Sequence, residues 1–111
     1  DIGRPLHEDD GTIPPVPGLA GPPDPSLEGV VISHGHRDHH GLAGAISPEV
    51  PLVMGPATER ILREAAFFSR DRFAPRAAMY LRDRVPLRMG PFTITPYLVD
   101  HSAFDAYALL V

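Results

Sequence analysis

The fold and the chemistry of this chain are decided by residues 34–41, which read His34-Gly35-His36-Arg37-Asp38-His39-His40-Gly41. Four of the six histidines lie in this stretch, directly after an apolar run. Gly35 lets the backbone bend so that His34 and His36 can face one ion. Asp38 and His39 follow at a spacing that suits a second ion beside the first. Neutral imidazole and carboxylate are good zinc ligands, and two neighbouring ions can share a bridging hydroxide. The string therefore predicts a metal site.

A histidine-rich surface loop that binds nickel or zinc fortuitously is the alternative interpretation. We favour a dedicated site, because the histidines form an ordered HxHxDH string at a strand-to-helix turn flanked by Gly41 and Gly44. We expect His40 to lie outside the ligand set, since adjacent side chains tend to diverge. We expect His7 to be an ordinary residue of a loop.

Around this string, strands and helices alternate, which is typical of a layered α/β fold. Residues 4–28 hold seven of the 14 prolines, and we expect them to form a loop. Pro56 suits the first turn of a helix that runs to about Arg72. The other expected elements are strands at 29–33, 51–54, 85–89, 92–99 and 106–111, a short helix at 41–46 and a turn at Gly90-Pro91.

Apolar side chains indicate which faces of these elements are buried. The run 29–33 is apolar and β-branched, which predicts a strand buried on both faces. In the helix, apolar residues recur at the spacing of a single face. The side chains that we expect in the core are Met54, Ile61, Leu62, Ala65, Phe67 and Phe68.

The composition is that of one globular unit of 111 residues with a formal net charge of −4. The charge is uneven, because residues 59–88 hold eight arginines and four carboxylates, a net of +4, which leaves −8 for the remainder. That segment is either a solvated helix face or a surface that binds anions. The chain has no cysteine, which excludes disulfides and thiolate ligands. Any metal must therefore be held by His, Asp or Glu.

The sequence contains no apolar run long enough to span a membrane and no leader peptide, so we expect no membrane partner and a cytoplasmic location. It starts at Asp1 without an initiator Met and stops within the apolar run 108–111, so we expect it to be part of a longer protein. An apolar end would leave an unpaired strand edge, which favours a homo-oligomer.

The string His34-x-His36-x-Asp38-His39 resembles the signature of the metallo-β-lactamase superfamily. Asp1-Ile2-Gly3 is similar to the Asp-x-Gly of this superfamily, in which the Asp supports the ligand turn. His101 follows the strand expected at 92–99, where the third histidine motif of the family is expected. The resemblance implies a four-layer αββα sandwich. Residues 1–111 would then be its N-terminal portion, a single incomplete domain that includes the 4–28 loop.

The residues around His101 resemble one branch of the superfamily. His101-Ser102-Ala103-Phe104-Asp105-Ala106 is similar to the His-Ser-x-x-Asp-[Ala/Ser] motif of the ribonuclease J-like RNA-processing nucleases. Ala103 and Phe104 stand where that branch usually has Ile-Pro. Lactamases and thioesterases usually have Gly before this histidine, whereas this chain has Asp100.

The resemblance implies a dinuclear zinc hydrolase that uses a zinc-bound hydroxide, with manganese as an alternative ion. Its first site would be His34, His36 and His101, and its second would begin with Asp38 and His39. Asp38 would also be the catalytic residue, because it would orient the nucleophile. The bridging acid and a late histidine ligand would lie beyond Val111, so we expect the fragment alone to be inactive. The carboxylates available to anchor the ligand rings are those of Asp1, Asp100 and Asp105.

The string from His101 to Asp105 favours RNA or another phosphodiester as the substrate, although the net charge of −4 does not support a nucleic-acid partner. One alternative is a hydrolase of a small ester, thioester or lactam. A second alternative is a metal-binding module without turnover, since the visible chain offers only the five ligands named above.

Overall fold

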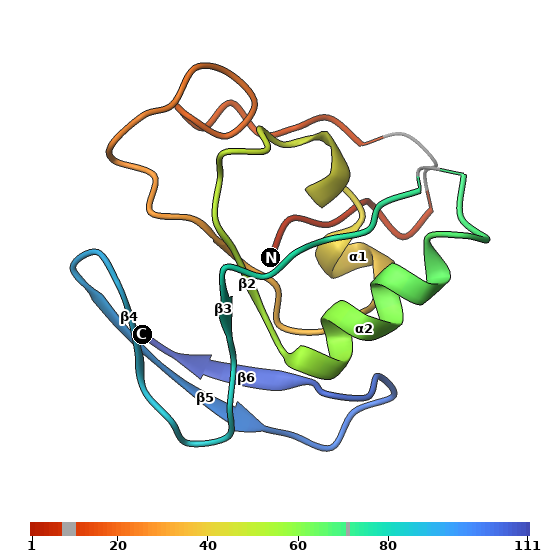
Figure 1. Cartoon of the computed structure of the whole chain (residues 1–111), viewed down its shortest axis with the longest axis vertical. Helices are drawn as coiled ribbons and strands as arrows, with labels where there is room; N and C mark the ends of the chain where they lie inside the picture. Colours follow the sequence, from red (N-terminus) through yellow and green to blue (C-terminus); the bar gives the residue numbers. More distant parts are fainter. Residues whose placement is uncertain (8–10, 71) are drawn as a thin grey trace.

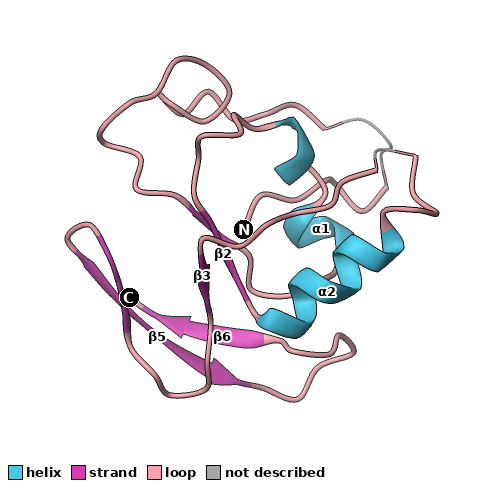
Figure 2. Ribbon diagram, in the orientation of Figure 1, coloured by secondary structure: helices cyan, strands magenta, loops and turns pink. Residues whose placement is uncertain are grey.

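The chain folds as a small mixed α/β domain with two sheets (Figures 1 and 2). The structure is a computed structural model that describes residues 1–7, 11–70 and 72–111. Its elements in chain order are β1 (Val30–Val31), α1 (Arg37–His40), the 3-10 turn η1 (Ala43–Ala45), β2 (Leu52–Met54), α2 (Pro56–Ala65), β3 (Met79–Tyr80), β4 (Leu87–Met89), β5 (Phe92–Leu98) and β6 (Tyr107–Leu110).

Each sheet has three strands. β1, β2 and β3 pair in parallel in that order, with Val30 opposite Leu52 and Val53 opposite Met79. β4, β5 and β6 form an antiparallel sheet, which lies at the bottom of Figure 1. Parallel neighbours need a crossover, and α2 supplies the one between β2 and β3. The domain thus combines one parallel and one antiparallel sheet.

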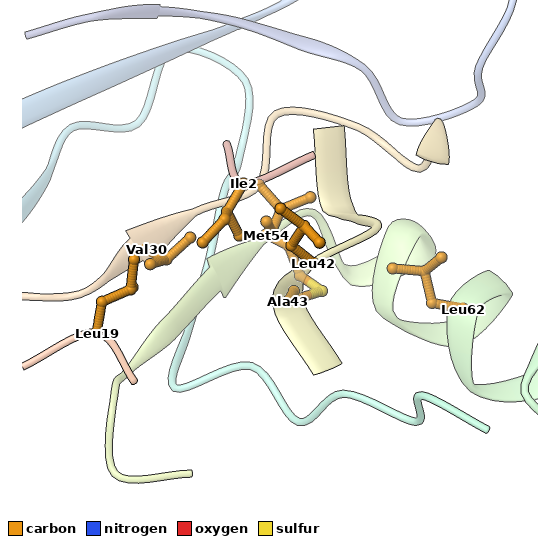
Figure 3. Close-up of a cluster of buried hydrophobic side chains, with 8 residues drawn as sticks. Ile2, Leu19, Val30, Leu42, Ala43, Met54 and Leu62 are labelled. Carbon is orange, nitrogen blue, oxygen red and sulfur yellow. The ribbon is translucent and has the colours of Figure 1, made fainter. Parts of the chain in front are cut away.

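The two faces of the parallel sheet pack into different cores. Successive side chains of a strand point to opposite faces. Met54 therefore joins a first core between this sheet, the helices and the loops (Figure 3), whereas Val53 joins an inter-sheet core. The first core consists of Ile2, Leu19, Val30, Ile32, Leu42, Ala43, Met54 and Leu62, and the inter-sheet core of Val53, Leu81, Met89, Ile94 and Tyr107.

The layer order is therefore helices, parallel sheet, antiparallel sheet. The prediction of a strand buried on both faces at 29–33 is confirmed, because Val30 and Ile32 lie in the first core and Val31 packs against the inter-sheet core. On the far side of the antiparallel sheet, Tyr97 and Leu110 are exposed. These three layers agree with the expected α/β class, and the four-layer sandwich stays a prediction.

Helix α2 begins where the sequence predicts and ends earlier. Pro56 is its first residue, but the helix ends at Ala65 and not near Arg72. The expected buried face is also partly wrong. The buried residues are Thr58, Leu62 and the capping residue Ala66, which recur every four positions, whereas Ile61 is 47% exposed.

Phe67 and Phe68, expected in the core, are each 85% exposed. The chain turns away from the sheet after Ala66, so both rings lose contact with the core and pack edge to face on each other, with centroids 5.1 Å apart. Ala65 is exposed because, like Ile61, it lies outside the helix row of Thr58, Leu62 and Ala66 that is buried. The predictions for Leu62 and Met54 are confirmed, since both are buried.

The short helix expected at 41–46 is present as the 3-10 turn η1, and the helix α1 before it was not predicted. The N–H groups of His39 and His40 both donate to the carbonyl of His36, which starts α1 inside the histidine string. The 3-10 turn η1 follows it. Strand β3 was not predicted, because only two residues pair. The strands expected at 85–89, 92–99 and 106–111 are present with shorter bounds, and the turn at Gly90-Pro91 joins β4 to β5.

The described part of the proline-rich loop, residues 4–7 and 11–28, contains no helix or strand, as expected, and residues 8–10 lie outside the described residues. Among the helices that the structure describes, none is long and apolar enough to cross a membrane. Strand β6 lies at an edge of its sheet, and association through that edge stays a prediction.

The two cores predict where truncation of a side chain destabilises the fold. Ile32→Ala and Leu81→Ala each remove a fully buried side chain, one from each core, and should lower the free energy of unfolding by about 3 kcal/mol. Phe68→Ala removes a side chain that is 85% exposed and should change it by about 0.5 kcal/mol or less. Urea unfolding measures all three values. A loss for Phe68→Ala as large as that for Ile32→Ala would contradict the described packing.

Candidate metal centre

Three histidine side chains converge at the end of the first buried strand. His34 Nε2 lies 3.2 Å from His36 Nδ1 and 3.2 Å from His101 Nε2. One ring nitrogen from each of the three residues lies within 4.8 Å of the others. His34 is only 6% exposed, His36 is half-buried and His101 is exposed. The three nitrogens therefore face one small volume that opens to solvent on the side of His101.

His101 reaches this position from the other end of the chain. It lies in the loop between β5 and β6, which runs beside the start of α2 in Figure 1. The N–H of Tyr107, at the start of β6, donates to the carbonyl of Ser33 at 3.0 Å. This bond ties the antiparallel sheet to the residue before His34. The expected trio of His34, His36 and His101 is thus brought together by the contact between the two sheets.

A chain of hydrogen bonds orients His34. The N–H and Oγ–H of Ser33 donate to the two carboxylate oxygens of Asp1, at 2.6 and 2.8 Å. Ser33 Oγ also lies 3.0 Å from His34 Nδ1. The hydroxyl proton points to Asp1, so Oγ can only accept from the ring, which puts the proton of His34 on Nδ1. The lone pair on Nε2 then faces His36 and His101, as a metal ligand requires.

His39 is held by the same carboxylate. Its Nδ1 lies 2.7 Å from Asp1 Oδ2, and its Nε2 lies 3.4 Å from Asp38 Oδ2. Its ring also packs at 3.9 Å, centroid to centroid, from that of His34. Asp38 and His39 are thus neighbours beside the trio and are not part of the group of three.

The N-terminal segment clamps the ligand turn. The N–H of Ile2 donates to the carbonyl of His39, and the carbonyl of Ile2 accepts from the N–H of Leu42. Gly3 lies against the backbone of Asp38, where a Cβ would overlap the Asp38 carbonyl oxygen. Only glycine leaves room for this approach. The Asp-x-Gly segment therefore supports the ligand turn through a carboxylate and a close backbone contact.

Burial keeps His34 neutral. Desolvation, followed by the charges of His39, His101 and His36, lowers the pKa of His34 to about 4. An imidazole in this environment does not compete for protons near neutral pH. The described side chains thus offer an unprotonated ring nitrogen at the buried end of the trio.

His40, His7 and Asp100 lie outside the group of three. The ring of His40 stacks on that of Phe73, with centroids 6.2 Å apart, so its side chain diverges from His39 as expected. His7 is exposed in its loop, and Asp100 is exposed beside His101.

Asp105 does not anchor a ligand ring, which corrects that expectation. Its Oδ2 accepts from the N–H groups of Ala57 and Thr58, both at 2.8 Å, in the first turn of α2. Its Oδ1 accepts from the hydroxyl of Tyr107 at 2.8 Å. Burial, and then this hydrogen bond, raise the pKa of Tyr107 to about 12, so the phenol keeps the proton that it donates. The first N–H groups of a helix have no partner within the helix and therefore attract a carboxylate. The Asp105 carboxylate accepts bonds from two of them.

Ser33 was not singled out from the sequence. It is a small hydroxyl residue directly before the first histidine, and that position was the only signal. A serine there can bond both the Asp1 carboxylate and the His34 ring, as the geometry shows.

The low pKa of His34 predicts how the stability of the metal-free chain depends on pH. An unfolded histidine titrates near pH 6.5, so the unfolded state binds more protons than the folded state between that pH and about 4. The free energy of unfolding should therefore fall as pH drops through this window and level off above it. Urea unfolding across the window should show a smaller fall for His34→Gln. Equal pH slopes for the two proteins would contradict the burial of a neutral His34.

Comparison with known proteins gives a weak and partial similarity to a nuclease. No family model matches the chain. The chain is 29% identical over 89 residues to Ribonuclease J of Sinorhizobium meliloti (strain Sm2011 / Rm2011 / 2011), covering 78% of this chain and 15% of that protein. A crystal structure of a protein of unknown function from Enterococcus faecalis V583 is similar with a TM-score of 0.59 and 27% identity, over 73% of this chain and 21% of that one. The chain therefore spans a small part of each protein that it matches.

Proposed function

We propose that His34, His36 and His101 bind a zinc ion, and that the protein carrying this chain is a ribonuclease J-like phosphodiesterase. The observation that carries the proposal is the meeting of three imidazole nitrogens from segments 67 residues apart, with contacts of 3.2 Å at His34 Nε2. A histidine cluster formed by chance on one surface loop would not recruit a third ring from a distant strand end.

The geometry of the trio suits zinc. Two nitrogens bound to one tetrahedral zinc at about 2.1 Å lie about 3.4 Å apart. The two contacts of His34 Nε2, each 3.2 Å, are close to that separation. The donor set is also suitable, because neutral imidazole is a common zinc ligand and the Asp1–Ser33 chain holds His34 in the required tautomer.

We propose that Asp38 and His39 begin a second site. His39 Nδ1 lies against Asp1, so its proton points there and its Nε2 lone pair points to Asp38 Oδ2, 3.4 Å away. Two electron-pair donors at this distance favour a cation between them. Manganese, which prefers carboxylate ligands, is the alternative ion for this position.

The residues of the candidate site have separate proposed roles in hydrolysis. Bound zinc would lower the pKa of a water molecule and polarise a phosphoryl oxygen. His34, His36 and His101 hold the ion, and Asp1 fixes the ring of His39 and, through Ser33, that of His34. Asp38, which is half-buried, presents its carboxylate beside this position and orients the attacking water.

The phosphodiester class rests on two supports. The name of the curated relative is Ribonuclease J, and the run from His101 to Asp105 resembles that branch. The arginine-rich segment 59–88 adds a net charge of +4, which attracts a polyanion such as RNA.

The same proposal includes the sandwich fold: the three layers of the described domain would be the N-terminal portion of the αββα arrangement, with residues 1–111 as one incomplete domain.

Two histidines of the same string provide a matched test of the metal site. His36→Ala removes a proposed ligand and should weaken zinc binding by at least about 100-fold. His40→Ala truncates a ring that stacks on Phe73 and should change the affinity by less than about threefold. Competition with a chromophoric chelator near neutral pH measures both affinities. Equal losses in the two variants would show that the cluster is a nonspecific histidine patch.

Asp38 provides the test of catalysis in the protein that carries this chain. Asp38→Ala removes a second-site ligand and the group that orients water, and should lower the rate of RNA cleavage by at least about 100-fold. Asp24→Asn is the control, because within the described part of the proline-rich loop that carboxylate bonds Ser26 and lies apart from the histidines. A chelator should abolish cleavage and added zinc or manganese should restore it. Cleavage that survives chelation, or ester hydrolysis without RNA cleavage, would overturn the proposal.

A further inference from the structure

His101 is the least supported of the three histidines. Its side chain is exposed, and its described contacts are with the rings of His34 and His36. Among the described residues, no serine or carboxylate orients it in the way that Ser33 orients His34. The position of its ring must therefore come from the backbone of the loop between β5 and β6.

Sheet pairing closes the base of that loop. The N–H of Val99 donates to the carbonyl of Ala106 at 3.0 Å, which extends the β5–β6 ladder by one bond. Residues 100–105 project beyond this bond, and His101 lies near its start. This bond holds the two ends of the six-residue loop together but does not fix the orientation of the loop. A second attachment is therefore needed to fix that orientation.

Asp105 makes that second attachment. Its carboxylate accepts two N–H bonds from the first turn of α2 and one hydroxyl bond from Tyr107, and its own carbonyl accepts from Thr58 Oγ1 at 3.3 Å. All the partners except Tyr107 lie 47 or 48 residues away in the sequence. The loop is thus joined, through its last residue before the ladder bond, to a helix that packs on the other sheet.

The backbone around Asp105 is shaped for this contact. Asp105 has φ 63°, a left-handed conformation that Asp and Asn adopt more readily than most residues. Gly55 lies directly before α2, and a Cβ there would overlap the Asp105 carboxylate. The left-handed backbone of Asp105 and the lack of a side chain at Gly55 together let the Asp105 carboxylate approach the first turn of α2.

We propose that Asp105 is a positioning residue, which holds the His101 loop against α2 and thereby places the His101 ring beside His34. This inference rests on the proposed function, since it gives the zinc affinity of the trio as the quantity that Asp105 controls. The His34 ring is oriented by the Asp1–Ser33 chain, to which Asp105 makes no direct described bond, so we expect the contact to act chiefly on His101.

A double-mutant cycle between positions 101 and 105 tests the inference through zinc affinity. Asp105→Ala should weaken zinc binding about 10-fold, the effect typical of losing a group that supports a ligand. In the His101→Ala background, the same change should have an effect of less than about twofold, because the ligand it positions is gone. Asp105→Asn can accept the same N–H bonds and tolerates the left-handed backbone, so it should restore most of the affinity.

Glu59→Ala is the matched control. Glu59 lies in the same helix and accepts bonds from the Ala77 N–H and the Tyr80 hydroxyl, which attach α2 to β3 and leave the His101 loop alone. It should destabilise the chain without weakening zinc binding by more than about twofold. An equal loss of affinity in Glu59→Ala and Asp105→Ala, or an undiminished effect of Asp105→Ala without His101, would overturn the inference and leave Asp105 a general helix cap.

A measurement without metal separates this inference from the proposed function. In the metal-free chain, nuclear Overhauser contacts between the ring protons of His101 and His34 should be present in the wild type and in Glu59→Ala, and lost in Asp105→Ala. Circular dichroism shows whether each variant is folded, and Asp105→Asn serves if Asp105→Ala is not. Ring contacts without zinc binding would refute the metal site and support the positioning role. Ring contacts that persist in a folded Asp105→Ala would refute the positioning role.

Discussion

Ser33 joins the parts of this structure, because its polar groups bond three different segments of the chain. Its N–H and hydroxyl donate to Asp1, its carbonyl accepts from Tyr107 and its oxygen Oγ accepts from the ring of His34. The N-terminal segment, the antiparallel sheet and the histidine string therefore meet at one nearly buried residue. A buried hydroxyl costs free energy unless it is paired, so this junction has a single favourable arrangement. The positions of Asp1 and His34 follow from it.

The candidate metal centre combines a buried part and an exposed part. His34 is buried among other imidazoles, which lowers its pKa to about 4 and keeps the ring neutral. His101 lies at the exposed side, on a loop fixed by sheet pairing and by Asp105. Burial supplies the right protonation state, and the open side supplies access for a substrate. The protonation state and the access from solvent are separate requirements, and histidines from different layers meet them.

Local patterns in the sequence predicted the parts of the fold that depend on near neighbours. The apolar run before His34 gave a strand, Pro56 gave the first residue of a helix, and the divergence of His40 from His39 followed from their adjacency. Long-range partners could not be predicted in the same way. Phe67 and Phe68 fit a helical spacing, yet the chain turns away from the sheet one residue earlier. The spacing of apolar residues indicates which side chains share a helix face, but it does not indicate how far the neighbouring sheet extends.

The candidate site divides along the same line. The family resemblance named the five residues of the candidate ligand set, and the structure brings three of them together. Asp1 was expected as a support, and its carboxylate bonds Ser33 and His39. Ser33 was missed and Asp105 was misassigned, because the bonds of Ser33 to Asp1 and of Asp105 to α2 cross 32 to 48 residues of sequence. The type of a residue shows which bonds it can make, whereas the choice of partner depends on the finished topology.

The order of these segments along the chain has a consequence for synthesis on the ribosome. Proteins emerge from the N-terminus, so the strands and helices of the first core, all within residues 2–62, are available before the last strand. His34 and His36 emerge with them, and His101 follows 67 residues after His34. A nascent chain thus presents two imidazoles at first, an incomplete ligand set with little hold on a metal ion. The three rings meet only when β6 pairs and its N–H reaches Ser33, so the proposed metal site would form last, once the topology is correct.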